Sequence, residues 1–268
     1  MNTEPEITVL SIGWGVQSWT LAAMCALGEY PKPNLVLHAD TTWEHAHTYE
    51  FAAEWTPWLE KYGMNLRTVS DSKAAKEIVT TRTRTHIPAF TLDDTTGSRG
   101  QLRRSCTHRW RIVPQRRAVR GELARRGLKT RPGIVRQLIG ISMDEWTRIK
   151  TSDVKYIDLE FPLVEMRMTR KDCMAWLTAK GLPIPQKSSC VFCPYHSHYA
   201  WYQLRQAAGS DWKTACEVDE IVRNKRQGYT CYLTDKRKPL EKLTFEDYEG
   251  EFLFDMSEYP CDSGHCFL

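Results

Sequence analysis

The chain has 268 residues, enough for one α/β domain with a sizeable core and a C-terminal extension. Hydrophobic residues make up 41% of it, no apolar run approaches membrane-spanning length and no signal peptide opens it, so the sequence predicts a cytoplasmic protein without a membrane partner. The net charge is only +4, and nine cysteines in a reducing compartment favour metal or thiol chemistry over disulfides.

The first predicted strand covers residues 7–11 and runs into a glycine-containing turn. Residues 11–18 read Ser-Ile-Gly-Trp-Gly-Val-Gln-Ser, and a helix is expected over 17–28. Such a turn points backbone N–H groups and a helix N-terminus at one spot, which suits an anion such as phosphate.

A second predicted strand, over residues 35–39, delivers Asp40, Thr41 and Thr42 at its carboxyl end. The carboxyl ends of neighbouring parallel strands form the ligand crevice of an open α/β sheet. The two units together therefore predict a nucleotide site. Trp43 comes next and is expected either to stack on the base or to lie in the core.

The rest of the chain alternates between strand and helix, which predicts a doubly wound, mostly parallel sheet with helices on both faces. We expect this nucleotide-binding domain over residues 1–165, and a helical, cysteine-containing extension over 166–268. Thr169 and Asp172 form a capping-box pattern that opens a helix over 170–180. The other expected elements are helices over 45–62, 72–79, 108–127, 197–208 and 212–226, strands over 65–69, 135–141 and 229–233, a long loop over 80–105, and a packed acidic tail from Glu241.

Residues 99–136 hold twelve arginines and one lysine against a single acid, Glu122, which gives this segment a charge of +12 and the rest of the chain −8. So basic a block favours contact with a phosphate backbone over pairing with acids elsewhere in the fold, because it is hard to neutralise internally. The candidate nucleic-acid ligands are Arg103, Arg104, Arg109, Arg111, Arg116 and Arg117.

Cys190 and Cys193 stand in a C-x₂-C motif, in which two thiolates can converge on one metal. The spacing alone fits zinc, an iron–sulfur cluster or a redox dithiol equally well. Cys106 follows two arginines and precedes a helix, an environment that lowers the pKa of a thiol and makes Cys106 a third candidate ligand. Further candidates are two tail cysteines and, for zinc, a histidine nitrogen: Cys261, Cys266, His196 and His265.

Charged residues after the fourth predicted strand are further candidates. Asp144 and Glu145 either contact Mg²⁺ or substrate, or begin the next helix. Arg148 either reaches the phosphates or pairs with Glu145 three residues earlier. Arg170 and Lys187 are candidate phosphate ligands.

Residues 11–18 resemble the pyrophosphate loop of the adenine nucleotide α-hydrolases, whose usual form is Ser-Gly-Gly-x-Asp-Ser. Asp40-Thr-Thr, with Thr48-Tyr49 and Tyr62-Gly63, is similar to the second motif of the sulfonucleotide (PAPS) reductase branch. Gly13, Trp14 and Gln17 depart from the family loop, and Asp40 or Asp144 would have to replace the missing aspartate. The similarity extends from about residue 7 to about residue 205, through residues 140–145, Arg148, 161–163, Arg170 and 187–194.

The resemblance implies a PP-loop fold of the HUP type that binds ATP and Mg²⁺, and cleavage of ATP between its α- and β-phosphates. It implies catalytic roles for Ser18, Gln17, Asp40, Asp144 and Arg148. It implies nucleotide binding by Ser11, Gly13, Trp14, Gly15, Val16, Gln17, Ser18, Asp40, Thr41, Thr42 and Trp43. The cysteines resemble the four-thiolate arrangement of relatives that move sulfur onto nucleic acid, which implies a [4Fe-4S] cluster at Cys106, Cys190, Cys193 and Cys266, with zinc as the alternative.

The function that this resemblance favours is an ATP pyrophosphatase that adenylates a nucleic acid for sulfur insertion, with DNA phosphorothioation ahead of tRNA thiolation. The expected partners are nucleic acid, a cysteine desulfurase or other persulfide donor, other subunits of a modification system, and a second copy in a homodimer. A sulfonucleotide reductase is an alternative, although the tail Cys-Asp-Ser-Gly-His-Cys differs from the Glu-Cys-Gly-Leu-His tail of those enzymes. A non-catalytic ATP-binding scaffold of a modification or defence complex is another.

Overall fold

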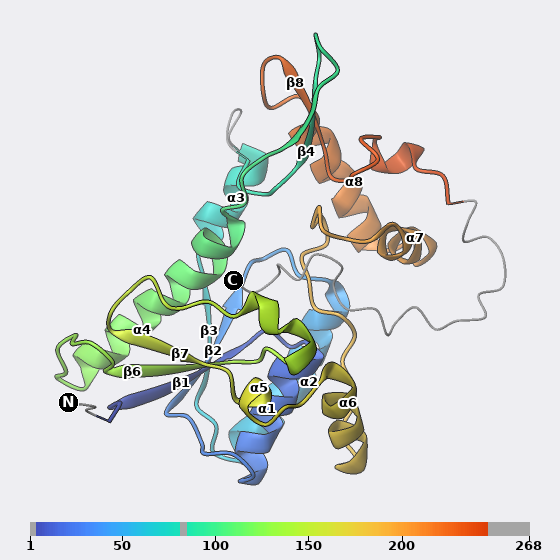
Figure 1. Cartoon of the computed structure of the whole chain (residues 1–268). Helices are drawn as coiled ribbons and strands as arrows, with labels where there is room; N and C mark the ends of the chain where they lie inside the picture. The colour runs from blue at the N-terminus through green and yellow to red at the C-terminus, as the bar shows by residue number, and fades with distance from the viewer. Residues whose placement is uncertain (1–3, 81–84, 246–268) are drawn as a thin grey trace.

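The structure is a computed structural model that describes residues 4–80 and 85–245. Its centre is a five-stranded parallel sheet in the order β3-β2-β1-β6-β7, flanked by helices (Figure 1). The strand order turns back at β1 and β6, so the predicted α/β class is confirmed, and the ligand-binding edge is expected where these two strands end. The strands are β1 (Ile7–Ile12), β2 (Leu35–Asp40), β3 (Leu66–Ser70), β6 (Val135–Ile139) and β7 (Ile157–Glu160).

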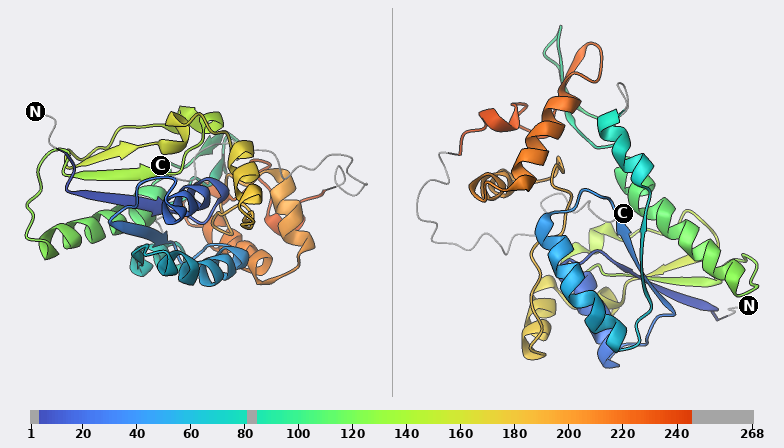
Figure 2. Two further views of the ribbon diagram at one scale, coloured as in Figure 1. Left: turned by 90° about the horizontal axis from the view of Figure 1, so that it is seen from below. Right: turned by 180° about the vertical axis from the view of Figure 1, so that it is seen from behind.

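Helices cover both faces of this sheet (Figure 2). Leu10 and Ile12 of β1 pack in one cluster with α1, α2 and α6, whereas Ile7 and Val9 pack with α4 on the other face. This two-residue period is that of a strand buried on both sides. The helices are α1 (Val16–Leu27), α2 (Ala46–Lys61), α4 (Val113–Arg125) and α6 (Arg170–Ala179), and α4 continues a π-helical turn, η1 (Thr107–Ile112).

The capping box that the sequence predicted is confirmed at the start of α6. The backbone N–H of Asp172 donates to Thr169 Oγ1 at 3.2 Å, and the N–H of Thr169 donates to Asp172 Oδ2 at 2.8 Å. Two short helices precede it: the 3-10 helix η2 (Met143–Arg148), where the sequence offered a helix beginning at Asp144 and Glu145 as one interpretation, and α5 (Pro162–Glu165), which had no counterpart in the sequence prediction.

A small antiparallel sheet lies apart from the parallel one, at the top of Figure 1. Its order is β5-β4-β8, with β4 (Phe90–Asp93), β5 (Arg99–Gln101) and β8 (Tyr229–Tyr232). The long loop predicted over 80–105 is therefore wrong in its described part. Thr91 of β4 lies opposite Cys231 of β8, and local sequence gives no sign of so distant a partner.

The second hydrophobic core surrounds this small sheet. Ile78 and Trp110 pack there with Phe192 and Val218, on elements from both halves of the chain. The elements are α3 (Ser72–Thr80), η1, α7 (His198–Gln206), α8 (Ser210–Arg223) and η3 (Leu240–Lys242). By contrast α6 packs against α1 in the first core, so the cores do not separate at residue 165, and the two-domain division stays a prediction.

The start of the predicted tail is packed, since Leu243 and Phe245 are buried in the second core. The tail from residue 246 lies outside the described residues, and with it Cys261, His265 and Cys266. Over residues 4–80 and 85–245, no helix is both long enough and apolar enough to cross a bilayer.

Eight of the twelve arginines in residues 99–136 form ion pairs with carboxylates. Six carboxylates from other parts of the chain fold against the block and offset half of its charge of +12, so internal pairing is more extensive than the sequence suggested. Nucleic-acid binding by this segment stays a prediction, with Arg103 and Arg104 outside these pairs. The pairs are Arg109–Glu77, Arg111–Glu44, Arg116–Asp153, Arg117–Asp71, Arg125–Glu122, Arg126–Glu122, Arg131–Glu6 and Arg136–Glu160.

Glu122 is buried against three guanidinium groups. Its Oε1 accepts from Arg125 at 2.6 Å and from Arg126 at 2.8 Å, and Arg67 lies 3.1 Å from Oε2. The hydrogen bonds from Arg125, followed by those from Arg126, outweigh the effect of burial and lower the pKa of Glu122 to about 2. The carboxylate thus stays charged in the fold at a pH where it is protonated in the unfolded chain.

This depressed pKa predicts a pH-dependent contribution to stability. The stabilisation is complete above about pH 4.5, the ordinary value, and is lost as the pH falls through about 2. We expect Glu122→Gln to lower the free energy of unfolding by about 2 kcal/mol at neutral pH, since solvent screens the exposed Arg125. Urea unfolding at neutral pH and near pH 2.5 measures this, with the exposed Glu217→Gln as control. An equal loss at both pH values would contradict the assignment.

Candidate nucleotide-binding site

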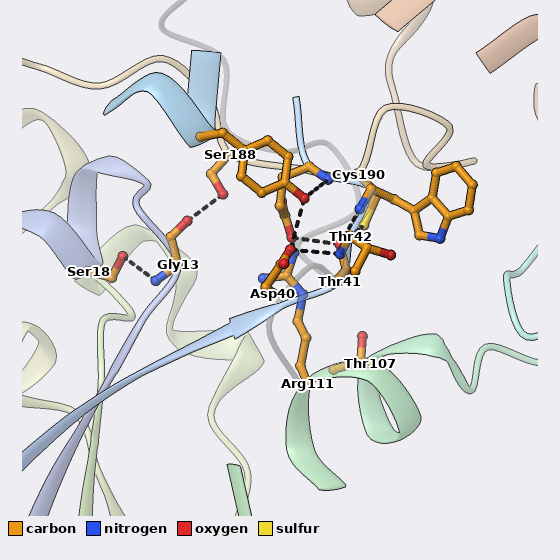
Figure 3. A network of polar contacts seen from close by, with 12 residues as sticks. Gly13, Ser18, Asp40, Thr41, Thr42, Thr107, Arg111, Ser188 and Cys190 are labelled. Atoms are coloured by element: carbon orange, nitrogen blue, oxygen red, sulfur yellow. Dashed lines mark hydrogen bonds and ion pairs between the residues drawn. The ribbon is translucent and has the colours of Figure 1, made fainter. Parts of the chain in front are cut away.

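The loop between β1 and α1 forms a cradle of backbone groups (Figure 3). The N–H of Gly13 donates to Ser18 Oγ at 3.1 Å, and Ser188 Oγ donates to the carbonyl of Gly13. Gly15 is the N-cap of α1 and has no side chain that accepts from the first-turn N–H groups. Those N–H groups are left for solvent or for an anion, the ligand that a helix N-terminus favours.

Trp14, which departs from the family loop, lies in the core. Its backbone is left-handed, with φ 58°, a conformation that side chains other than glycine rarely adopt. Its indole is 1% exposed and packs against Trp19, His38 and Phe51. The indole therefore anchors the loop in the core. It is not among the residues that line the cavity beside the loop, which is described next.

A cavity of about 580 Å³ opens beside this loop, at the carboxyl ends of β1 and β6. Its walls come from the loop, from β6 and β7, from η1 and α4, and from the segments around η2 and Lys187. Cations outnumber acids strongly, since Glu145 and Asp153 are the only acids among the described residues of the wall. This charge balance suits a polyphosphate. The cationic side chains in the wall are Arg104, Arg111, Arg116, Arg148, Lys150, Arg170 and Lys187.

The cavity gathers part of the predicted site. Its wall includes Ser11, Gly13, Gly15, Val16, Gln17, Ser18 and Arg148. Five predicted residues lie elsewhere in addition to the indole of Trp14: Asp40, Thr41, Thr42, Trp43 and Asp144.

Asp40 is held in a turn by its neighbours. Its Oδ1 accepts from the N–H of Thr42 at 2.7 Å and from the Tyr49 hydroxyl at 2.9 Å (Figure 3). Thr42 is itself left-handed, with φ 64°, which is unusual for a β-branched residue and marks a strained turn. Trp43 lies in the second core, where its indole N–H donates to the carbonyl of Ala75 at 3.2 Å. Of the two interpretations that the sequence left open for Trp43, packing is therefore the one that fits.

The carboxylate beside the loop belongs to Glu145, whereas Asp144 accepts a hydrogen bond from the N–H of Arg170 at 3.0 Å. Gln17 Nε2 donates to Glu145 Oε2 at 3.1 Å, and Arg148 Nη1 lies 2.6 Å from Glu145 Oε1. Both partners of this ion pair are buried and line the cavity. Glu145 thus supplies at the loop a negative charge that Gln17 does not carry.

The three described cysteines of the predicted metal set come together. Cys106, Cys190 and Cys193 line one small cavity of about 40 Å³. Burial raises the pKa of the Cys190 thiol to about 12, and its Sγ lies 3.4 Å from Thr41 Oγ1. Within the described part of the chain, no three His, Cys, Asp or Glu side chains are grouped closely enough to hold a single metal ion. The two cavities share four residues of wall: Arg104, Thr107, Arg111 and Tyr195.

A buried ion pair joins the loop after β2 to the basic helix. Arg111 Nη2 donates to Glu44 Oε1 at 2.6 Å, and Thr41 Oγ1 donates to the same oxygen at 2.9 Å. Glu44 also forms an isolated backbone bridge with Cys190. These contacts tie the second strand, η1 and the C-x₂-C motif into one unit (Figure 3).

His196, the described candidate for a zinc nitrogen, is engaged elsewhere. Its Nε2 lies 3.0 Å from the carbonyl oxygen of Cys190, and its ring packs against Trp201 and His45. Burial lowers the pKa of His196 to about 3, so the ring is neutral. It is not part of the wall of the cysteine cavity.

No protein-family model matches the sequence, and a search of curated proteins finds no match. Several solved structures are similar to the fold, two of which are named here. The phosphoadenylyl-sulfate (PAPS) reductase from Candida auris, in complex with phosphate, is 13% identical over 68% of this chain and 76% of its own, with a TM-score of 0.42. The U34-tRNA thiolase NcsA from Methanococcus maripaludis, with its [4Fe-4S] cluster, is 13% identical over 96% and 79%, with a TM-score of 0.43. Likenesses of this size carry no argument about activity.

Proposed function

We propose that this protein is an ATP pyrophosphatase that adenylates a nucleic-acid acceptor and prepares it for sulfur insertion. The observation that carries the proposal is the shared wall: Arg104, Thr107, Arg111 and Tyr195 line both the cationic cavity and the cysteine cavity. A triphosphate site and a sulfur site would thus lie on two sides of the same few side chains.

The residues of the chain supply binding and charge stabilisation. The N–H groups of residues 16–18, in the first turn of α1, hold the leaving pyrophosphate, and Arg148, Arg170 and Lys187 offset the charge that develops on it. An acceptor oxygen attacks the α-phosphorus while the bond from that phosphorus to the bridging oxygen breaks, and the electron pair leaves with pyrophosphate. Glu145, an oxygen donor of the type that Mg²⁺ prefers, would hold this ion, which neutralises phosphate charge when bound.

Cys106, Cys190 and Cys193 would hold a [4Fe-4S] cluster, with Cys266 as the proposed fourth ligand. The donor set fits, because the three thiols line one cavity and Arg104 and Arg111 beside it offset the negative charge of thiolate ligands. Zinc is the alternative for the same thiols, and the iron and zinc content of the purified protein separates the two. When bound, the cluster supplies a site that binds or orders sulfur.

DNA is the acceptor that we propose, with a persulfide donor such as a cysteine desulfurase as the source of sulfur. The support is the resemblance of the sequence to enzymes that move sulfur onto nucleic acid and the cations that the wall offers to a phosphate backbone. Three other functions give different products: a tRNA thiolase yields thiolated RNA, a sulfonucleotide reductase yields sulfite, and an ATP-binding scaffold yields none.

The test is pyrophosphate release by anaerobically purified protein of measured iron content, given ATP, a persulfide donor, and either DNA or tRNA. We expect release from ATP and a loss of about a hundredfold in a Gln17→Ala, Ser18→Ala double variant of unchanged fold, because the leaving group loses its positioning contacts. The matched control is Gln206→Ala with Ser210→Ala, two exposed residues of the same types. Sulfite from PAPS, or ATP binding without turnover when all partners are present, would overturn the proposal.

A further inference from the structure

The 3-10 helix η2 presents two different faces. The segment is kinked at Glu145 (φ −112°, ψ 18°), so the exposure of each side chain, and not a helical period, shows which face it belongs to. Glu145 and Arg148 are about 9% and 8% exposed and line the cationic cavity. Met143 and Trp146 are 41% and 60% exposed, and Ile149, directly after the helix, is 38% exposed. One side of η2 therefore faces the cavity, and the other presents an apolar ridge (Met143, Trp146 and Ile149) to solvent.

The segment before α6 extends this ridge. The N–H of Met143 donates to the carbonyl of Met168 at 2.8 Å, and the Asp144 carboxylate accepts from the N–H of Arg170 at 3.0 Å. These contacts place residues 166–170 beside η2. Met166 is 40% exposed there, and Arg170 belongs to the wall of the cavity.

Two cations lie beside the ridge, together with the exposed Asp144, whose carboxylate accepts from the backbone N–H of Arg170. Lys150 follows the ridge directly and is exposed, and Arg170 flanks it from the neighbouring segment. Exposed aromatic rings beside such cations are the elements of sequence-tolerant binding sites for single strands, where bases stack on rings while cations contact phosphates. An apolar protein partner would contact the ridge but not the cations. A single strand of nucleic acid can stack its bases on the ridge and place its phosphates near the cations.

We propose that the ridge stacks unpaired bases of a single-stranded nucleic acid, with Trp146 as the main platform and with an adjoining phosphate directed into the cationic cavity. The inference rests on the proposed function, because it names how the acceptor strand of that site is held. It is nevertheless a claim about strand binding in the absence of nucleotide, so it can fail while ATP cleavage stands.

The experiment measures binding of the full-length protein, without ATP, to fluorescein-labelled 15-nucleotide single strands of DNA and of RNA by fluorescence anisotropy. We expect Trp146→Ala to weaken binding of the preferred strand roughly five- to a hundredfold, the range for loss of one stacking ring. Trp146→Phe should retain most of the affinity, because it keeps a π-face. The dependence of affinity on salt should be the same in Trp146→Ala as in the wild type, since no phosphate contact is removed.

The control is Tyr229→Ala, which removes an aromatic ring that is 45% exposed on β8, in the small sheet. It should leave strand binding unchanged, and thermal unfolding of all variants should match the wild type. Wild-type affinity in Trp146→Ala, or equal weakening in Tyr229→Ala, would overturn the inference and leave the ridge to a protein partner. ATP-dependent pyrophosphate release by the same variants separates this failure from failure of the proposed function.

Discussion

Gly140→Ala is expected to abolish nucleotide binding. A Cβ at position 140, just after β6, would lie 2.7 Å from both the Cα and the backbone N of Ser18. Neither atom can rotate away as a side chain would, so the first turn of α1 must move relative to the sheet. A displacement of about 1 Å in a group that positions the substrate can cost about a hundredfold. We therefore expect the dissociation constant for ATP, measured by calorimetry, to rise at least about that much.

Gly121→Ala is the matched control for this substitution. Gly121 lies within α4 at an exposed position, and a Cβ added there would have no neighbouring side chain or distant backbone atom within 4 Å. Alanine there removes the entropic cost of glycine in a helix and is expected to stabilise the fold by about 0.5–1 kcal/mol without affecting ATP. Thermal unfolding and circular dichroism establish that both variants fold. Wild-type ATP affinity in folded Gly140→Ala would show that the start of α1 is not the phosphate site.

Arg111→Ala is expected to cause the largest loss of stability among the arginine substitutions in α4 and η1. It leaves Glu44 without its cation, although the Glu44 side chain is only 1% exposed. Removal of one partner from a buried ion pair costs about 3–5 kcal/mol, because the remaining charge cannot be solvated. Chemical denaturation measures the loss, and we expect the free energy of unfolding to fall by that amount.

Arg117→Ala is the control for this effect. Arg117 also pairs with a carboxylate, Asp71, but its side chain is 60% exposed and solvent replaces the lost partner. Its removal should cost less than about 1 kcal/mol. The Arg111→Ala, Glu44→Ala double variant should be more stable than Arg111→Ala alone, since no buried charge is left unpaired. Equal losses in Arg111→Ala and Arg117→Ala would contradict this account.

Elements with strong local signals could be predicted from the sequence. The turn at Gly15, the capping box at Thr169 and the alternating units around β1 and β2 each depend on a few neighbouring residues, and the structure confirms these elements. The pairing of β4 with β8 could not be predicted in this way, because its hydrogen bonds join segments that are distant in the chain. The strand β7 had a local signal, the alternation of Ile157 and Leu159 with acids, and was missed because it is short.

The candidate site likewise has parts that local sequence predicts and parts that depend on residues distant in the chain. All of the loop residues 11–18 except Trp14 line the cavity, because consecutive positions of one turn lie close together in space. The partners of Glu44 and of Glu145 depend on how η1 and η2 dock onto the sheet, and sequence spacing does not encode that docking. Arginine pairing was misjudged for the same reason, because carboxylates such as Asp71 and Asp153 are remote in sequence from the arginines that they neutralise.

The burial of Trp14 has a consequence for how the loop meets its ligand. The Trp14 indole packs against Trp19, His38 and Phe51, and these contacts hold the loop between β1 and α1 against the core. We therefore expect the loop to keep its shape when the site is empty, so that a ligand is selected for its match to a preformed cradle and does not reshape it.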